Sequence, residues 1–349
     1  MSARRLLVFG GIALIASGML FGDIFAVFVL HQNAGKQGDA LILASAAVAA
    51  GDPAPVGQAF SELGGLLEDR GTKVDAHVHA IGAGYLALLL ALVQPCVVLG
   101  PATKKRLAAL FLIGGTFLPI GIFTIHYVGL AYSPFSSIGW ASVVADTAGA
   151  LLIVVLTVEA WGFRKYLRTR ELTEAALPDD DDSPRRALLS GGAILILLGF
   201  LHGAWYAGTY LYQHERMETD ILRNMISDAS ANDVPGAVGR VTEFGNLAGA
   251  RAVNIAAHSH IIEFGLLAML LAFVQPFVFL SEKWKRRWTQ ILLAGSVILP
   301  VFVLLELRLG LLAGGIADLG GLMVIVALLG MLVGVLRYTG TLDATRGTA

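Results

Sequence analysis

The sequence predicts an all-α integral membrane protein with eight transmembrane helices, arranged as two tandem four-helix repeats. Of its 349 residues, 56% are hydrophobic and 15% are charged, whereas a soluble protein carries about 25% charged residues. The mean hydropathy is +0.72. A net charge of −1 offers no long-range attraction to a polyanion. Composition therefore excludes a soluble enzyme, a nucleic-acid-binding protein and a disordered scaffold, and it makes the lipid bilayer the expected surroundings.

The eight spans follow from length and apolar content. A helix needs about 20 mostly apolar residues to cross the hydrocarbon core of a bilayer. Eight segments meet this requirement, and in chain order they are residues 6–30, 76–99, 107–131, 138–162, 188–212, 256–280, 288–312 and 318–337.

The basic residues set the expected orientation. Pairs and clusters of Arg and Lys all fall on one side of the membrane under this assignment, and positively charged loops stay in the cytoplasm. We therefore expect a multi-pass protein of the cell membrane (plasma or inner) with both termini cytoplasmic and its first span retained. Two linkers, 32–72 and 213–252, then lie outside, and helical spacing of their apolar residues predicts short helices over the outer mouth of each bundle. The clusters begin at Arg4, Lys104, Arg164, Arg185, Lys283 and Arg337.

A shift of 181 positions lays the first half of the chain over the second. The strongest match is HVHAIGAGYLALLLALVQP from His77 against HSHIIEFGLLAMLLAFVQP from His258. The sequence thus predicts a first repeat at 1–170, an acidic cytoplasmic linker at 171–184 and a second repeat at 185–349. Each repeat has four spans, so both enter the membrane from the same side. A pseudo-two-fold axis along the membrane normal should relate them, as in transporters with parallel repeats.

Histidines mark the candidate functional site. His77, His79, His258 and His260 open the second span of each half, and His126 lies near the outer end of the third span. Ionisable side chains inside a membrane are costly and therefore suggest function. Imidazole is a common haem ligand, and two histidines on facing helices give a six-coordinate electron-transfer centre.

The ligand pair differs between the halves. His77 or His79 with His126 is the best axial pair in the first half. The second half has Leu307 in place of His126, so there His202, or a ligand from across the pseudo-axis, would have to serve.

One glycine follows the first histidine of each H-x-H pair at the same spacing. Gly84 follows His77 by seven residues, and Gly265 follows His258 by seven. Seven residues are nearly two helical turns, so each glycine lies on the histidine's face. We expect this space to admit a flat macrocycle, which favours haem over a compact ion.

Other polar side chains extend the candidate site. Arg70 and Arg251 precede the histidine spans and suit haem propionates, because guanidinium binds carboxylate through two hydrogen bonds; salt bridges to Glu62 or Glu243 are the alternative. Gln94 and Gln275, each before a proline, either shape a helix end or line a quinone or substrate pocket. The remaining carboxylates and the one further arginine have open roles in protonation, capping or metal binding: Asp23, Asp75, Asp146, Glu263, Glu306, Arg308 and Asp318.

The pattern H-x-H-x-x-x-x-x-G at the start of a span resembles the haem-associated histidine segment of NnrS-type membrane proteins and of relatives of haem–copper oxidase subunit I. This resemblance covers about 20 residues in each half. It implies b-type haem ligation by His77 or His79 and by His258 or His260. The tandem four-helix layout is also similar to haem A synthase, whose ligand spacing this chain does not reproduce.

These observations favour a membrane protein with one or two b-type haems near the outer face. Its expected role is electron transfer or small-gas redox chemistry, with quinone and redox-chain subunits as candidate partners and no nucleic acid. Two other functions stay open. One is a secondary transporter built from parallel repeats. The other is a copper, zinc or non-haem iron site built from the same histidines with Asp146, Glu306 or Asp318.

Overall fold

The computed structural model describes residues 2–128, 140–169, 183–206, 209–210 and 212–337. Within these ranges the chain is helical and contains no strand. Eight helices of the described chain are long and apolar enough to cross a membrane. The predicted multi-pass, all-helical membrane protein is therefore confirmed. Most of the acidic linker lies outside the described residues.

The apolar helices match the eight expected spans in order. Their ends differ from the predicted ones by a few residues, apart from two helices that begin much earlier in the chain. The helices are α1 (Ala3–Phe25), α3 (Pro53–Val93), α4 (Pro101–Val128), α5 (Trp140–Thr169), α6 (Ser183–Tyr206), α8 (Val234–Val274), α9 (Glu282–Leu309) and α10 (Leu311–Arg337).

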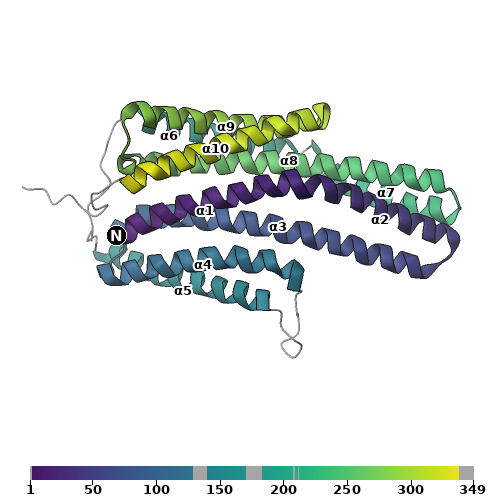
Figure 1. Ribbon diagram of the computed structural model, residues 1–349, viewed down its shortest axis with the longest axis horizontal. Helices are drawn as coiled ribbons and strands as arrows, with labels where there is room; N and C mark the ends of the chain where they lie inside the picture. The colour runs from purple at the N-terminus through teal and green to yellow at the C-terminus, as the bar shows by residue number, and fades with distance from the viewer. Residues whose placement is uncertain (1, 129–139, 170–182, 207–208, 211, 338–349) are drawn as a thin grey trace, which may run out of the picture.

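The linkers 32–72 and 213–252 form long helical hairpins with the spans that follow them, whereas the sequence predicted short helices there. α2 (His31–Ala50) runs back along the first part of α3, and α7 (Tyr212–Ser230) runs back along the first part of α8. α3 and α8 have 41 residues each. At 1.5 Å per residue such a helix is about 60 Å long, twice the roughly 30 Å of hydrocarbon. Both hairpins therefore project well beyond the other spans (Figure 1).

Each hairpin turns at an aspartate that caps the following helix. Asp52 accepts a hydrogen bond from the backbone N–H of Ala54 (3.1 Å), and Asp233 accepts one from Gly236 (3.0 Å). A proline follows each aspartate in the first helical turn, where its missing N–H costs nothing. Sequence chemistry thus fixes where each hairpin turns.

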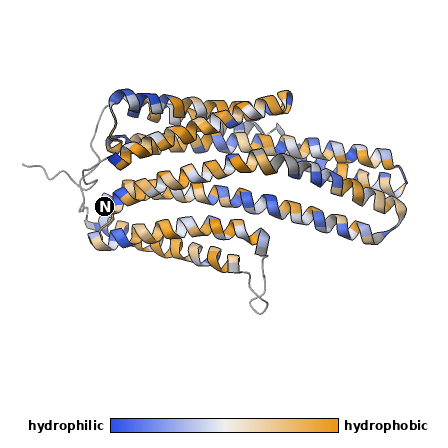
Figure 2. Ribbon diagram, viewed as in Figure 1, coloured by the Kyte–Doolittle hydropathy of each residue, from blue (hydrophilic) through white to orange (hydrophobic). Residues whose placement is uncertain are grey.

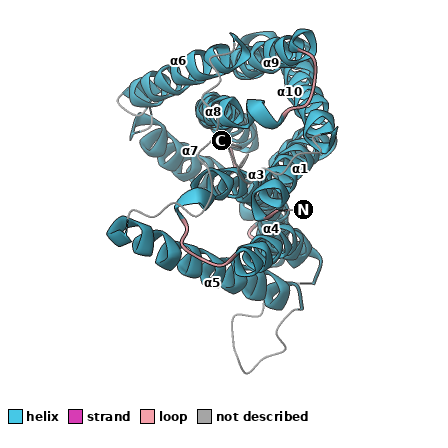
Figure 3. Cartoon of the chain, turned by 90° about the vertical axis from the view of Figure 1, so that its left-hand side faces the viewer, coloured by secondary structure: helices cyan, strands magenta, loops and turns pink. Residues whose placement is uncertain are grey.

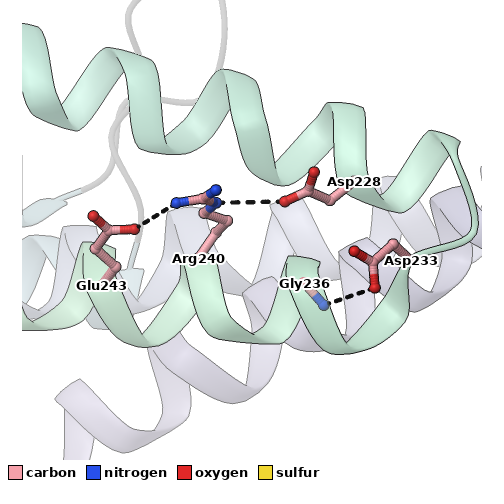
Figure 4. A network of polar contacts seen from close by, with 5 residues as sticks. All are labelled: Asp228, Asp233, Gly236, Arg240 and Glu243. Carbon is pink, nitrogen blue, oxygen red and sulfur yellow. Dashed lines mark hydrogen bonds and ion pairs between the residues drawn. The ribbon is translucent and has the colours of Figure 1, made fainter.

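The two hairpins pack against each other. α2 contacts both α7 and α8, and a small apolar core joins them. Within the second hairpin, Arg240 of α8 bridges Asp228 of α7 (3.4 Å) and Glu243 one turn along (3.0 Å), as Figure 4 shows. The core consists of Leu41, Met225, Ala229, Ala237 and Val241.

The opposite part of the molecule is the apolar bundle. Figure 2 shows hydrophobic residues concentrated there, while the hairpins are more mixed. α3 and α8 contact each other near the centre, and the other spans lie around them (Figure 3). α1 also packs against α10, so one buried core includes residues from both halves. The candidate histidines of α3 and α8 lie between this bundle and the hairpins.

A π-helical segment joins α1 to α2. It covers Ala26–Leu30, and Thr209 and Tyr210, which lie 181 residues after Phe28 and Val29, are π-helical as well. π-helical turns are rare and often occur at functional sites. The π-helical residues thus occur at the same place in both halves, between the first span and the first helix of the hairpin.

Candidate functional site

His77 and His258 occupy matching positions in the two halves. Nδ1 of His77 on α3 lies 2.7 Å from the carbonyl oxygen of Gly18 on α1. Nδ1 of His258 on α8 lies 2.9 Å from the carbonyl oxygen of Gly199 on α6. Both partners of the second pair stand 181 residues after those of the first. Each imidazole is thus tied to the neighbouring span.

A glycine makes room for each of these rings. A β-carbon at Gly22 would lie 2.4 Å from Cε1 of His77, and one at Gly203 would lie 2.3 Å from Cε1 of His258. Such distances are far inside van der Waals contact. Each imidazole therefore rests on a glycine of the adjacent helix, in a position that a larger residue would block.

The backbone contact selects the tautomer of each ring. A carbonyl oxygen only accepts hydrogen bonds, so Nδ1 carries the hydrogen and Nε2 of the neutral ring has a free lone pair. Histidines that bind metals are commonly held in this way, with one ring N–H donated to a backbone carbonyl. In both His77 and His258 this leaves Nε2 as the acceptor nitrogen.

The second half adds another imidazole. The ring centroid of His202 on α6 lies 6.5 Å from that of His258, and the planes differ by 31°. Both ring nitrogens of His202 are buried. The Asn254 amide lies beside this ring as a hydrogen-bond partner and also donates to the carbonyl of Ala250 (2.9 Å). One amide can serve only one of the two ring nitrogens, and a buried polar group without a partner costs about 1–3 kcal/mol, so the other nitrogen points to a ligand.

The corresponding position in the first half is Phe21. Its ring packs edge-on against Phe123 at a centroid distance of 5.3 Å. His77 therefore has no imidazole from α1 beside it. His126 was its expected partner, but the side chains of His126 and His31 lie outside the described part of the structure.

The other histidines serve different contacts. His79 is exposed, and its Nδ1 lies 2.7 Å from the carbonyl of Asp75 on its own helix. His260 stacks on Phe264 (centroids 5.8 Å apart). His214 contacts the carbonyl of Tyr210 (2.9 Å). In each H-x-H pair the first histidine contacts the adjacent span, and the 200° separation along a helix points the second in another direction.

The space beside Gly84 and Gly265 is filled, so the expected room for a macrocycle is absent there. A β-carbon at Gly84 would meet Ile15 at 2.5 Å and the carbonyl oxygen of Gly11 at 2.7 Å. Gly265 lies against Gly192 and Ile196 in the same way (2.7 Å each). These glycines instead allow close approach of two spans, as small residues commonly do in membrane bundles.

The arginines belong to the hairpins. Arg251 pairs with Glu218 of α7 (3.1 Å), whereas the sequence suggested Glu243, which pairs with Arg240. Arg70 lies half-buried on the hairpin part of α3. Tyr206, just beyond the apolar span that ends at Gly203, has a buried hydroxyl.

Ionisable groups from both halves meet between α1, α8 and α10. Asp23 of α1 lies within electrostatic range of His260 and Asp318, and a β-carbon at Gly321 of α10 would lie 2.8 Å from its Oδ1. Nδ1 of His260 lies 3.8 Å from Oε2 of Glu263. The sequence identified these residues one by one, but their convergence depends on α1 packing against α10. Asp146 on α5 and Arg308 on α9 are exposed.

A second polar cluster lies at the other end of the bundle. The side-chain amide nitrogen of Gln94 donates to both carboxylate oxygens of Glu159 (3.2 and 3.1 Å), and Lys104 donates to the backbone carbonyl of Gln94 (2.6 Å). All three side chains are buried. In the second half the Gln275 amide meets only the sulfur of Met331 (3.7 Å). Sequence reasoning missed Glu159 and Lys104; the acidic residue near the end of an apolar span was the available signal.

These contacts divide the candidate residues into three groups: the glycine-supported histidines, the carboxylates between the halves, and the glutamine clusters at the opposite end. Among the described residues, no group of three or more His, Cys, Asp or Glu side chains could hold a metal ion.

Comparison with family models, with curated proteins and with solved structures found no match to this chain.

Proposed function

We propose that this chain is an integral membrane metalloprotein in which His258 and His202 bind one copper ion, and that the ion serves electron transfer near the outer face. The observation that carries this proposal is the buried imidazole of His202, whose ring centroid lies 6.5 Å from that of His258. A bound metal ion would satisfy one ring nitrogen of His202, and the Asn254 amide is the partner for the other.

The spacing of the rings supports two ligands on opposite sides of one ion. Metal–imidazole bonds are about 2.0–2.1 Å long, so two such bonds plus the two ring radii place the centroids on the order of 6 Å apart. The tautomer of His258, fixed by the carbonyl of Gly199, leaves Nε2 as its donor atom. The donors and their separation therefore suit a bis-imidazole ion.

The number of ligands favours copper. Structural zinc sites use four protein ligands and catalytic ones three, and non-haem iron commonly takes two histidines with a carboxylate. Cuprous copper binds stably between two opposed imidazoles, and cupric copper binds nitrogen ligands most tightly among the divalent first-row metals. When bound, copper supplies a one-electron couple. The protein's part is to hold the imidazoles and to exclude water.

A compact ion is favoured over haem for a steric reason. The sequence argument for haem depended on free space beside Gly84 and Gly265, and neighbouring spans occupy that space. The two-imidazole arrangement itself would suit either iron in a porphyrin or a bare ion. Detection of bound haem b would therefore overturn the copper proposal.

Metal analysis with an absorption spectrum of the purified protein tests this proposal. We expect about one copper per chain, since the residues that the structure describes bring one pair of imidazoles, His202 and His258, together. His202→Phe, which installs the side chain found 181 residues earlier at Phe21, should remove the copper. His79→Gln is the matched control, because His79 is exposed, and it should keep the metal. Full copper in His202→Phe, or sharp α and Soret bands in the wild type, would overturn the proposal.

We also propose that the two halves are tandem repeats related by a pseudo-two-fold axis along the membrane normal. Three features recur 181 residues apart: the contact of a histidine with a glycine carbonyl, the close approach of two glycines between neighbouring spans, and the π-helical turn. The side chains that differ, Phe21 against His202 above all, then explain why one half holds the ion.

Proton-coupled transport is a second candidate function. It is favoured by Asp23 and Glu263, whose counterparts in the other half are Ala204 and Gly82, and by His260, whose counterpart His79 is exposed. Parallel-repeat transporters place such groups at the repeat interface. If transport is the function, proteoliposomes with a trapped pH dye should show uptake of protons that Asp23→Asn abolishes. Proton uptake that persists in Asp23→Asn would exclude this role for the carboxylate.

A further inference from the structure

An open surface cavity of about 450 Å³ lies in the first half, where the bundle meets the hairpins. Its walls come from the junction of α1 and α2, from the hairpin part of α3 and from the end of α4. Small-molecule sites commonly have volumes of about 300–1,000 Å³. The cavity is therefore large enough for a ring-sized ligand group.

The π-helical segment forms the apolar wall. Phe28 and Val29 belong to it, and Leu66 of α3 lies opposite. The aromatic side chains at the cavity, Phe28 and Tyr127, are 63% and 62% exposed. Two exposed aromatic rings and aliphatic groups at this junction suit a flat apolar ring.

The floor of the cavity is polar and already ordered. Lys73, which is only 7% exposed, pairs with Oδ1 of Asp69 and lies 5.5 Å from the ring centre of Tyr127. Oδ2 of Asp69 accepts a hydrogen bond from the amide of Asn33 (3.1 Å). Ammonium and amide donors are therefore fixed beside the aromatic wall.

The charges at the cavity balance. Lys73 and Asp69 form a pair on the floor, and Lys36 and Glu62 add one charge of each sign at the rim. An anionic lipid headgroup would thus find no excess positive charge. An uncharged ligand with hydrogen-bonding oxygens and an apolar tail fits these surroundings better.

We propose that this cavity binds the head group of a membrane quinone or quinol. Its ring would lie against Phe28 and Tyr127, its oxygens would face the Lys73 and Asn33 donors, and its tail would run into the bilayer. The cavity shares no residue with the proposed copper site. Quinone binding and copper binding can therefore fail separately.

Equilibrium binding of decylubiquinone to the full chain in phosphatidylcholine nanodiscs tests this inference. Leu66→Trp fills the cavity, and Leu247→Trp, 181 residues later, adds the same bulk to the other hairpin. We expect the dissociation constant to rise about tenfold or more in Leu66→Trp and to change less than about twofold in Leu247→Trp. Circular dichroism confirms folding of both. Tyr127→Leu, which removes an exposed ring without adding bulk, should also weaken binding.

Three results would overturn the inference: no saturable binding by the wild type, equal affinity in the wild type, Leu66→Trp and Tyr127→Leu, or equal weakening by Leu66→Trp and Leu247→Trp. A lipid site is distinguished by extraction. Phosphatidylglycerol retained by the wild type and lost from Leu66→Trp, without quinone binding, would identify the occupant as a lipid.

Discussion

The absence of a β-carbon at two glycines leaves the space that the rings of His77 and His258 occupy. The rings of His77 and His258 lie where a β-carbon of Gly22 or Gly203 would stand. We expect Gly203→Ala to push the His258 ring away, to destabilise the fold by about 1–3 kcal/mol, as overpacking of a tight site does, and to abolish copper binding. Thermal unfolding and metal content measure the two effects.

Gly22→Ala is the matched variant in the other half. It should destabilise the protein similarly, because the clash with His77 is as close, yet leave the copper content unchanged. Copper retained in Gly203→Ala, or lost equally in both variants, would show that metal binding does not depend on the position of the His258 ring.

The sequence identified candidate site residues, but it did not predict which side chains pack against them. Repeated spacing predicted a ligand at His77 or His79 and another at His258 or His260, and in the structure His77 and His258 contact a neighbouring span. The same spacing argument failed for Gly84 and Gly265, because helical periodicity gives the face of a residue but not what packs on it. His202 was a candidate ligand, but its proximity to His258 required knowing that α6 packs on α8.

Buried glutamines at the bundle's other end give a prediction for single side chains. Gln94 donates to the buried carboxylate of Glu159, so Gln94→Leu should cost about 1.5–3 kcal/mol, the contribution of a hydrogen bond to a charged group. Gln275 meets only a sulfur, and its Oε1 is buried without a hydrogen-bond partner in the described residues. Gln275→Leu should therefore be neutral or stabilising. Equal melting temperatures for the two variants would refute this assignment.

At the scale of elements, the hairpins are joined through a small core. Leu41 of α2 is 5% exposed and packs among residues of α7 and α8, whereas Leu43 is 45% exposed. Leu41→Ala should remove about 2–5 kcal/mol of packing, and Leu43→Ala should stay within about 0.5 kcal/mol of the wild type. Faster hydrogen exchange in α7 of Leu41→Ala alone is the expected signature. Unchanged protection of α7 would mean that the hairpins are independent.

The apolar spans were predictable and the hairpins only in part. Apolar runs of about 20 residues identify a span without reference to its neighbours. Helical spacing also indicated helices in 32–72 and 213–252, but not that α3 and α8 continue unbroken for 41 residues. Polar residues such as Asp69 and Arg70 end a transmembrane segment without ending the helix, because helices need backbone hydrogen bonds rather than apolar side chains.

For the whole molecule, the distribution of charge predicts the sidedness on which the proposed redox role depends. Basic clusters such as Lys104–Arg106 and Lys283–Arg287 lie at the end of the bundle away from the hairpins, and positive loops stay in the cytoplasm. In a Cys96→Ser background, a membrane-impermeant maleimide should label Ala231→Cys, at a hairpin turn, in intact cells. Ser281→Cys, exposed before α9, should react only after permeabilisation. The reverse pattern would place the histidines and the quinone cavity on the cytosolic side, so that an electron acceptor for the copper ion would have to be sought there.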